Sequence, residues 1–276
     1  MPDADDRPVA RQGRRFDDDL ALLEAAARKA GAIALSHFRR DPQVWTKDNN
    51  SPVSEADYAV DRFLAEELGA ARPDYGWLSE ETTDAPDRLE RDRVFIIDPI
   101  DGTRAFIEGK DDWTISLAVV EAGRPVAAAL YAPVHEEMFL ARPGSGLTRN
   151  DVAVHVGSRT TLDEARLAGP WPLLKAVAAR YPGFVNAGFV PSLAYRFALV
   201  ADGRLDGALA RANAHDWDIA AADLLLAEGG GKLTDASGAA IRYNSPEIRH
   251  PALIAAARDL HETLRTTIAQ GTDGKA

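Results

Sequence analysis

Apolar residues recur with helical spacing in some parts of this chain and form short runs in others. Between Asp17 and Arg40 they return to one face every three or four residues, which predicts a helix. Further helices are predicted over Ser54–Gly69, Trp171–Arg180, Leu193–Ala201 and Asp218–Glu228. Strands are predicted over Val94–Ile97, Thr114–Val120, Val126–Tyr131, Glu137–Ala141, Val152–Val156, Gly207–Ala210 and Leu253–Ala256. This mixture of elements predicts an α/β or α+β sandwich of stacked layers.

The organisation along the chain suggests a tail and two lobes. Residues 1–15 are polar and charged, which predicts a disordered tail. A change of character near Gly157–Thr161 divides an N-terminal α+β lobe, residues 16–157, from a C-terminal α/β lobe, residues 158–270. We expect the two lobes to form a single catalytic unit. The segment Asp41–Val53 reads as a loop or hairpin, and Gly229–Gly231 reads as a helix C-terminus because no strand precedes it.

Composition and charge exclude several classes of function. The 276 residues include no cysteine, which excludes disulfides, thiol catalysis and cysteine-type zinc sites. The six histidines show no metal-binding spacing. A formal net charge of −11 disfavours nonspecific binding to a nucleic-acid polymer. No apolar run reaches membrane-spanning length and the start lacks a signal-peptide core, so we expect a cytoplasmic protein without membrane insertion.

The segment from Asp98 to Thr103 carries the strongest chemical signal. It places two carboxylates, Asp98 and Asp101, at the end of a buried strand, where they repel each other unless a cation lies between them. Oxygen ligands without cysteine or histidine favour Mg²⁺. Pro99 restricts the turn, and Gly102 permits a close approach of a ligand to the backbone. A helix starting near Thr103 would direct free N–H groups at a phosphate.

An ordinary turn followed by a helix cap would explain Gly102 and Thr103, but not a second acid beside a buried strand. Two other segments bear on the choice. Trp77–Thr82 reads as a short strand running into Glu80 and Glu81, and Asp218 opens a helix as its N-cap. Alone, the first would be a solvated loop and the second a cap. Together with Asp98 and Asp101 they give four acids at element ends, which suits two or three divalent metal ions.

The three motifs Trp-x-x-Glu-Glu, Asp-Pro-Ile-Asp-Gly-Thr and Trp-Asp-x-Ala-Ala, in this order, resemble those of the inositol monophosphatase superfamily. The likeness runs from about Asp17 to about Leu264. It implies a Mg²⁺-dependent, Li⁺-sensitive phosphomonoesterase with a five-layer αβαβα sandwich, acting on a small phosphorylated metabolite. Members of the superfamily commonly form homodimers, so a homodimer is a further expectation that the sequence itself leaves open.

The resemblance also implies roles for individual residues. One metal ion would be held by Glu80, Asp98 and the Ile100 carbonyl, a second by Asp98, Asp101 and Asp218, and a third, looser one by Glu80 and water. Backbone N–H groups of Gly102 and Thr103 would face the phosphate. Thr103 and Asp57 would orient and deprotonate the attacking water. Ser54-x-x-Asp57 also reads as a near capping box, and both readings hold together. Lys47 matches a loop lysine of relatives but reads better as solvated.

The substrate is less clearly indicated. Arg211 stands where inositol phosphatases carry a glutamate for the ring hydroxyls, and Arg196 stands where bisphosphate nucleotidases carry a basic residue. Two arginines near the pocket would read a second phosphate, as in 3′-phosphoadenosine 5′-phosphate. The alternative is that both form solvated surface ion pairs. Inositol monophosphate, histidinol phosphate and sugar phosphates remain open as substrates, and a non-enzymatic metal- or phosphate-binding regulator remains open as a function.

Overall fold

The computed structural model describes residues 8–46 and 52–272 of the chain. Its α-helices are α1 (Pro8–His37), α2 (Glu55–Ala71), α3 (Thr103–Ile107), α4 (Trp171–Arg180), α5 (Leu193–Ala201), α6 (Asp216–Glu228) and α7 (Arg258–Thr272). A short 3₁₀ helix, η2, spans Pro86–Glu90. Most of the helices predicted from apolar spacing are therefore present, with α4 and α5 at the expected residues.

Two sheets and two short strand pairs complete the described part of the chain. The larger sheet has the order β3-β4-β5-β6-β7-β8-β9, with β3 (Gly76–Ser79), β4 (Arg93–Asp101), β5 (Thr114–Glu121), β6 (Arg124–Ala132), β7 (Glu137–Ala141), β8 (Leu147–Arg149) and β9 (Val152–Val154). The smaller sheet has the order β11-β10-β12-β16-β14, with β10 (Arg166–Ala168), β11 (Val185–Asn186), β12 (Gly207–Ala210), β14 (Gly231–Asp235) and β16 (Leu253–Ala257). The pairs are β1 (Val44–Thr46) with β2 (Pro52–Ser54) and β13 (Ala214–His215) with β15 (Arg249–His250).

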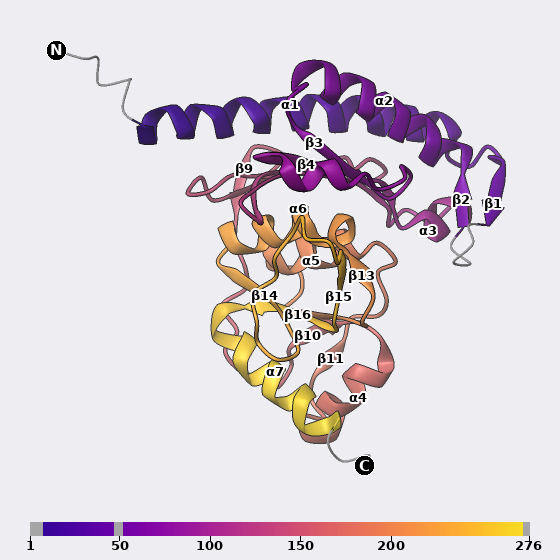
Figure 1. Cartoon of the computed structure of the whole chain (residues 1–276). Coiled ribbons are helices and arrows are strands. Elements are labelled where there is room, and N and C mark those ends of the chain that lie inside the picture. Colours follow the sequence, from indigo (N-terminus) through magenta and orange to yellow (C-terminus); the bar gives the residue numbers. More distant parts are fainter. Residues whose placement is uncertain (1–7, 47–51, 273–276) are drawn as a thin grey trace.

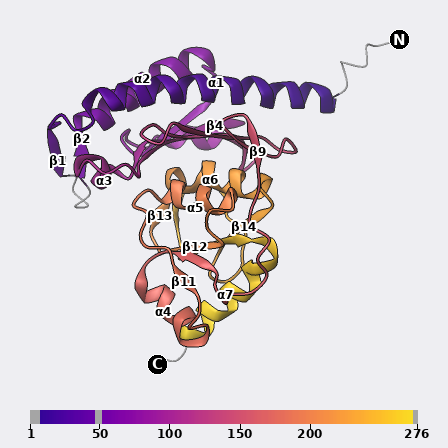
Figure 2. The same ribbon diagram turned by 180° about the vertical axis from the view of Figure 1, so that it is seen from behind.

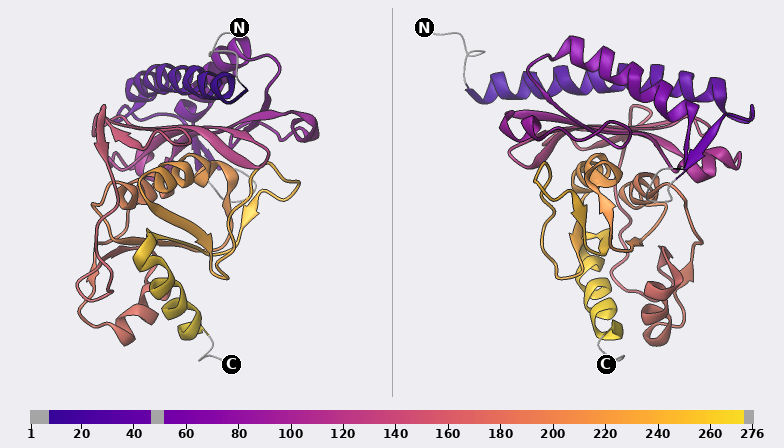
Figure 3. Two further views of the ribbon diagram at one scale, coloured as in Figure 1. Left: turned by 90° about the vertical axis from the view of Figure 1, so that its left-hand side faces the viewer. Right: turned by 45° about the vertical axis from the view of Figure 1, so that its right-hand side comes forward.

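These elements stack in five layers (Figure 1). Helices α1 and α2 cover one face of the larger sheet, and α5 and α6 lie between the two sheets. Helices α4 and α7 cover the far face of the smaller sheet, as the reverse view also shows (Figure 2). The two side views separate the layers most clearly (Figure 3). The αβαβα sandwich implied by the motif resemblance is therefore present.

Strand alternation explains why the larger sheet lies between two helical layers. In β4 the side chains of Phe95 and Ile97 pack toward α1 and α2, whereas those of Val94 and Ile96 pack toward α5 and α6. Because successive strand residues point to opposite faces, a strand apolar at every position needs a cover on both sides. The run Val94–Ile97 is of this kind, and every residue of β4 is buried.

The N-terminal helix differs from its prediction. Helix α1 begins at Pro8, so the disordered tail predicted for residues 1–15 is wrong for residues 8–15, and residues 1–7 lie outside the described part. Apolar spacing did not predict this first stretch because it contains few apolar residues. The packed part is anchored by Asp19, which is fully buried and pairs with Arg93 of β4 at 2.5 Å. The opposite charge offsets the cost of burying either group alone.

Other boundaries follow the sequence closely. The segment predicted as a loop or hairpin contains β1 and β2, which pair antiparallel, and Lys47 lies outside the described residues. Gly229 is the C-cap of α6, as predicted. The division into lobes at residue 157 stays a prediction, and a loop without regular structure follows β9 there. No helix in ranges 8–46 and 52–272 combines the length and apolar character needed to cross a membrane.

Candidate active site

Strand β4 delivers two acids to the centre of the molecule. Asp98 and Asp101 lie at its C-terminal end, and the pairing with β5 shifts register between them. Pro99 has no N–H to donate and therefore suits this irregular stretch. The backbone N–H of Ile100 donates to Asp98 Oδ1 at 3.1 Å, which fixes the first carboxylate relative to the turn. The Asp98 side chain is 1% exposed, so water gives its charge almost no relief.

Helix α6 brings a third acid from the other half of the chain. The helix begins at Asp216, with His215 as its N-cap, so the prediction that Asp218 is the N-cap is wrong. Asp218 is the third helical residue, and its Oδ2 accepts from the His215 backbone N–H at 2.7 Å. The reciprocal capping box therefore replaces the simple cap expected from sequence. It holds the carboxylate at the helix end that faces β4.

The three carboxylates converge. One oxygen each from Asp98, Asp101 and Asp218 lies within 4.8 Å of the others. Burial, followed by the charges of Glu80, Asp101 and Asp218, raises the pKa of Asp98 well above its usual range. Burial and the charge of Asp218 raise the pKa of Asp101 to about 7. The main influences on both groups penalise ionisation, so the cluster is electrostatically incomplete without a cation.

The N-terminus of α5 positions Asp101. Its Oδ2 accepts from Ser192 Oγ at 2.5 Å and from the Ala194 backbone N–H at 2.7 Å. These bonds oppose the rise of the Asp101 pKa and direct that oxygen at the helix end. No role in the site was predicted for Ser192 from the sequence. Its signal was a serine between Pro191 and an apolar helical segment, which is typical of an N-cap, and Ser192 is the N-cap of α5.

Gly102 follows Asp101 in a conformation that favours glycine. Its φ is +97°, in the left-handed region, and it is the N-cap of α3. A side-chain carbon here would lie 3.1 Å from the Asp112 carbonyl oxygen and 3.3 Å from Ser192 Cβ. The glycine therefore serves the sharp passage from β4 into α3, beside the residue that holds Asp101.

Glu80 reaches the same region from the neighbouring strand. Strands β3 and β4 run parallel, so their C-terminal ends lie at one edge of the sheet. The Glu80 backbone N–H donates to the Ile97 carbonyl at 3.2 Å, which keeps this residue beside the end of β4. Among the charges that raise the pKa of Asp98, that of Glu80 has the largest effect. The fourth predicted acid is therefore close enough to act on the cluster.

Asp57 and Thr103 form the second part of the site. Thr103 Oγ1 lies 3.1 Å from Asp57 Oδ1 and 3.1 Å from the Ile100 carbonyl. The other carboxylate oxygen of Asp57 accepts from the Ser54 backbone N–H at 2.8 Å and from Ser54 Oγ at 2.6 Å. The capping box predicted for Ser54-x-x-Asp57 is present, and it holds Asp57 against the threonine hydroxyl.

The donor set fits divalent magnesium. Three carboxylates with oxygens within 4.8 Å, a fourth nearby and the Ile100 carbonyl supply hard oxygen ligands. A pair of such cations would remove the repulsion that raises the pKa values of Asp98 and Asp101. The buried charge therefore argues for a metal site more strongly than the residue types alone.

The two arginines proposed from sequence lie differently. Arg196 is buried and donates to the carbonyls of Val190 (3.0 Å from Nε) and Leu209 (3.0 Å from Nη1), so the solvated surface ion pair is wrong for it. The ring of Phe189 lies 4.8 Å from its guanidinium carbon. Burial lowers the pKa of Arg196 to about 10. Its N–H groups are used on the backbone, which favours a role in shaping the pocket over direct phosphate contact.

Arg211 is exposed at a cavity of about 440 Å³. The residues that line it, many of them apolar, are Pro170, Phe189, Leu193, Arg196, Ala210, Arg211, Ala212, Asn213 and Ala214. Leu193 lies between the two residues that bind Asp101, and Ala214 leads through β13 into α6. The cavity lining therefore includes neighbours in sequence of the residues that bind Asp101 and of the helix that carries Asp218.

Comparison with known proteins agrees with the geometry. The model of the inositol monophosphatase family matches residues 17–272. The chain is 34% identical over 233 residues to the inositol-1-monophosphatase of Rhizobium meliloti, covering 79% of this chain and 86% of the relative. It is 31% identical over 233 residues to the 3′(2′),5′-bisphosphate nucleotidase CysQ of Aggregatibacter actinomycetemcomitans, covering 80% and 86%.

A solved structure extends the likeness to the fold. The Thermotoga maritima IMPase superposes with a TM-score of 0.80 at 27% identity, covering 95% of this chain and 99% of the other. Proteins of the family that matches this chain are metal-dependent phosphatases that act on phosphomonoesters. With the family model spanning nearly all of the described residues, this chain belongs to the inositol monophosphatase family.

Proposed function

We propose that the chain is a Mg²⁺-dependent phosphomonoesterase that hydrolyses 3′-phosphoadenosine 5′-phosphate or a closely similar bisphosphate. The observation that carries the choice of substrate is Arg211 at the rim of the cavity beside the acid cluster. A cation on a largely apolar wall suits a leaving group with a flat apolar part and a second phosphate. A glutamate there would repel that phosphate.

The proposed roles follow the distances. Glu80, Asp98, the Ile100 carbonyl, Asp101 and Asp218 would hold two or three Mg²⁺ ions. Divalent cations in such a site neutralise the charge of a phosphate ester and make water a stronger acid. Without them, the acid cluster would repel the dianionic substrate.

The proton of the attacking water would pass to the Asp57–Thr103 pair. Asp57 Oδ1 lies against Thr103 Oγ1, and the opposite oxygen is engaged by Ser54. Thr103 thereby orients the water through its hydroxyl while Asp57 takes the proton. Backbone N–H groups of Gly102 and Thr103 would hold the phosphate, and no covalent intermediate is required.

Inositol-1-phosphate is the second candidate substrate, because the 34%-identical relative is named inositol-1-monophosphatase. A release assay of inorganic phosphate from 3′-phosphoadenosine 5′-phosphate, inositol-1-phosphate, histidinol phosphate and a sugar phosphate, with and without Mg²⁺, distinguishes the two. The expected result is Mg²⁺-dependent release that is fastest with the bisphosphate. Tight binding without turnover of any substrate would instead indicate a regulator.

Reversing the charge of Arg211 tests the substrate directly. Arg211→Glu is expected to shift the ratio of kcat/KM for 3′-phosphoadenosine 5′-phosphate to that for inositol-1-phosphate roughly 100-fold toward the inositol ester. The matched control is Arg180→Glu, at the C-terminal end of α4, which reverses a charge away from the cavity lining. Equal ratios in wild type and Arg211→Glu would remove the case for the nucleotidase.

A further inference from the structure

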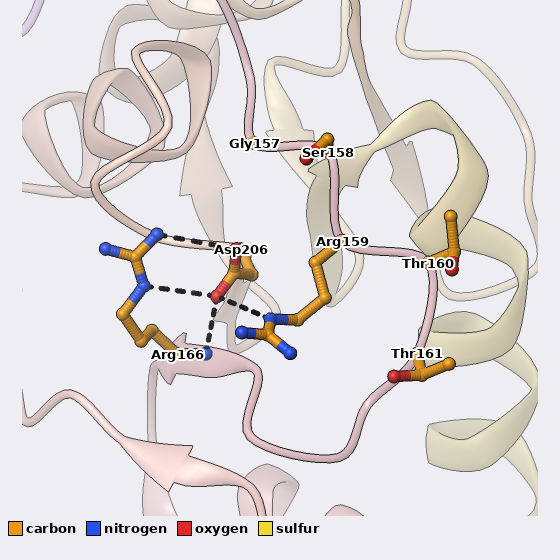
Figure 4. A pocket seen from close by; sticks show the side chains of 7 residues that line it. All are labelled: Gly157, Ser158, Arg159, Thr160, Thr161, Arg166 and Asp206. Atoms are coloured by element: carbon orange, nitrogen blue, oxygen red, sulfur yellow. Dashed lines mark hydrogen bonds and ion pairs between the residues drawn. The ribbon is translucent and has the colours of Figure 1, made fainter.

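A second cavity opens on the C-terminal half of the molecule. Its volume is about 500 Å³, and the residues that line it are Gly157, Ser158, Arg159, Thr160, Thr161, Arg166 and Asp206. None of these residues lines the cavity beside the acid cluster. The loop 157–161 forms one side, and Arg166 and Asp206 form the other (Figure 4).

One buried carboxylate arranges the two arginines. Asp206 is 4% exposed, and its Oδ2 accepts from the Arg166 backbone N–H at 2.8 Å and from Arg166 Nε at 3.2 Å. The same oxygen lies 3.6 Å from Arg159 Nε. Arg166 Nη2 also donates to the Gly203 carbonyl at 2.7 Å, which fixes the Arg166 guanidinium further. The two cations are thus held in place before any ligand arrives.

The cavity retains unused positive charge. Two guanidinium groups face one carboxylate, which leaves one formal positive charge in the lining. Glu164 lies 3.8 Å from Arg159, but its side chain is 81% exposed, so solvent screens most of its charge. The arginine side chains are 35% and 45% exposed and remain accessible to a solute.

The loop adds neutral donors. Ser158, Thr160 and Thr161 are exposed and carry hydroxyl groups on the loop that forms one side of the cavity. In Figure 4 the guanidinium of Arg159 extends from this loop toward Asp206, between the loop and Arg166. Guanidinium groups with hydroxyl donors are the combination that binds tetrahedral oxyanions, since each oxygen accepts several short bonds.

We propose that this cavity is an accessory site for a phosphate group, either free or carried by a small metabolite. The volume exceeds what one phosphate ion needs, so a small organic part fits beside it. The lining contains no aromatic residue, which argues against a nucleobase as the organic part. The site is separate from the proposed catalysis, and its test does not depend on the substrate of the enzyme.

The test measures phosphate binding to the full chain in EDTA. Removing divalent cations removes the ions that would hold phosphate at the cluster of Asp98, Asp101 and Asp218, so calorimetry is directed at the accessory cavity. Inorganic phosphate and glycerol 3-phosphate are titrated separately. Binding of either supports the site, and tighter binding of glycerol 3-phosphate assigns the ligand to phosphorylated metabolites rather than to free phosphate.

Arg159→Gln is the informative variant, because Arg166 also holds the buried Asp206 and its loss would disturb the fold. We expect at least roughly tenfold weaker binding of both probes in Arg159→Gln and unchanged binding in the control Arg180→Gln. Phosphatase activity in Mg²⁺ should be retained in Arg159→Gln, which separates this proposal from the proposed function. Equal affinity in Arg159→Gln and wild type, or no binding in EDTA, would overturn it.

Backbone NMR locates the binding independently of affinity. Phosphate added in EDTA should shift the amide signals of residues 157–161 and 166 and leave those near Asp98 and Asp218 in place. Shifts confined to the acid cluster would contradict the proposal. Weaker binding at 500 mM than at 50 mM NaCl would support recognition of the phosphate charge by the two arginines.

Discussion

Asparagine at position 98 is expected to reduce kcat to background, by at least roughly 1,000-fold, while the protein still folds. The carboxylate is almost fully buried and shares its surroundings with Asp101, Asp218 and Glu80. Asparagine has nearly the same volume and keeps an oxygen that accepts from the Ile100 N–H, so packing is preserved. It removes one of the negative charges on which cation binding depends. Steady-state phosphate release and circular dichroism measure the two halves of the expectation.

The matched control for Asp98→Asn is Asp223→Asn. Asp223 is a partly buried acid, five residues beyond Asp218 on α6, and it accepts a hydrogen bond from the Tyr243 hydroxyl at 3.0 Å. An amide oxygen can accept the same bond. This variant should keep most of the activity, which would show that losing an interior acid near the cluster is not sufficient to inactivate the enzyme. Near-wild-type turnover in Asp98→Asn would refute its assignment as a metal ligand.

The metal-free protein is expected to lose stability as pH rises, on account of Asp101. The pKa of Asp101 is about 7 in the folded chain, whereas the ordinary pKa of an aspartate side chain, taken here for the unfolded chain, is 3.8. A carboxyl group whose folded pKa is raised stays protonated longer in the folded state, so its stabilising contribution is complete below about pH 4. That contribution falls through the window between the two values and is lost above about pH 7. The full loss is on the order of 4 kcal/mol.

The measurement is urea unfolding in EDTA between pH 4 and pH 8, comparing wild type with Asp101→Asn. Asparagine cannot ionise and still accepts from Ser192 and Ala194, so the variant should gain on wild type as pH rises. The comparison between the two proteins removes the contribution of other titrating groups. At pH 8, Mg²⁺ should raise the free energy of unfolding of wild type but not that of Asp101→Asn. A difference between them that stays constant with pH would contradict a raised Asp101 pKa.

Most of the acid cluster could be predicted because its residues lie at element ends that local sequence reveals. The apolar run Val94–Ile97 identified β4, and the two acids after it had to occupy its buried end. Glu80, after β3, and Asp218, on α6, come close to the end of β4 only through contacts between distant parts of the chain. Apolar periodicity describes single elements and does not specify which ends meet. The motif resemblance supplied that part of the prediction.

The side-chain partners could not be predicted in the same way. The sequence offered Arg196 either as a phosphate-binding residue or as a solvated surface cation, yet carbonyls of Val190 and Leu209 accept its N–H groups inside the protein. Asp218 lies at the third helical position instead of the N-cap, and its carboxylate accepts from the His215 backbone N–H in a capping box. The accessory cavity depends on Asp206 and Arg166, forty residues apart and joined by strand pairing between β10 and β12. Only the assembled fold places them together.

The positions of the clustered acids along the chain have a practical consequence. Asp98 and Asp101 precede the loop 157–161, and Asp218 follows it, so a gene cut within that loop would encode two fragments with an incomplete ligand set each. Neither fragment would hold the complete set, because Glu80, Asp98 and Asp101 lie in the first fragment and Asp218 lies in the second. Joined to two interacting proteins, such fragments would form a complementation reporter whose phosphatase signal requires both association and magnesium.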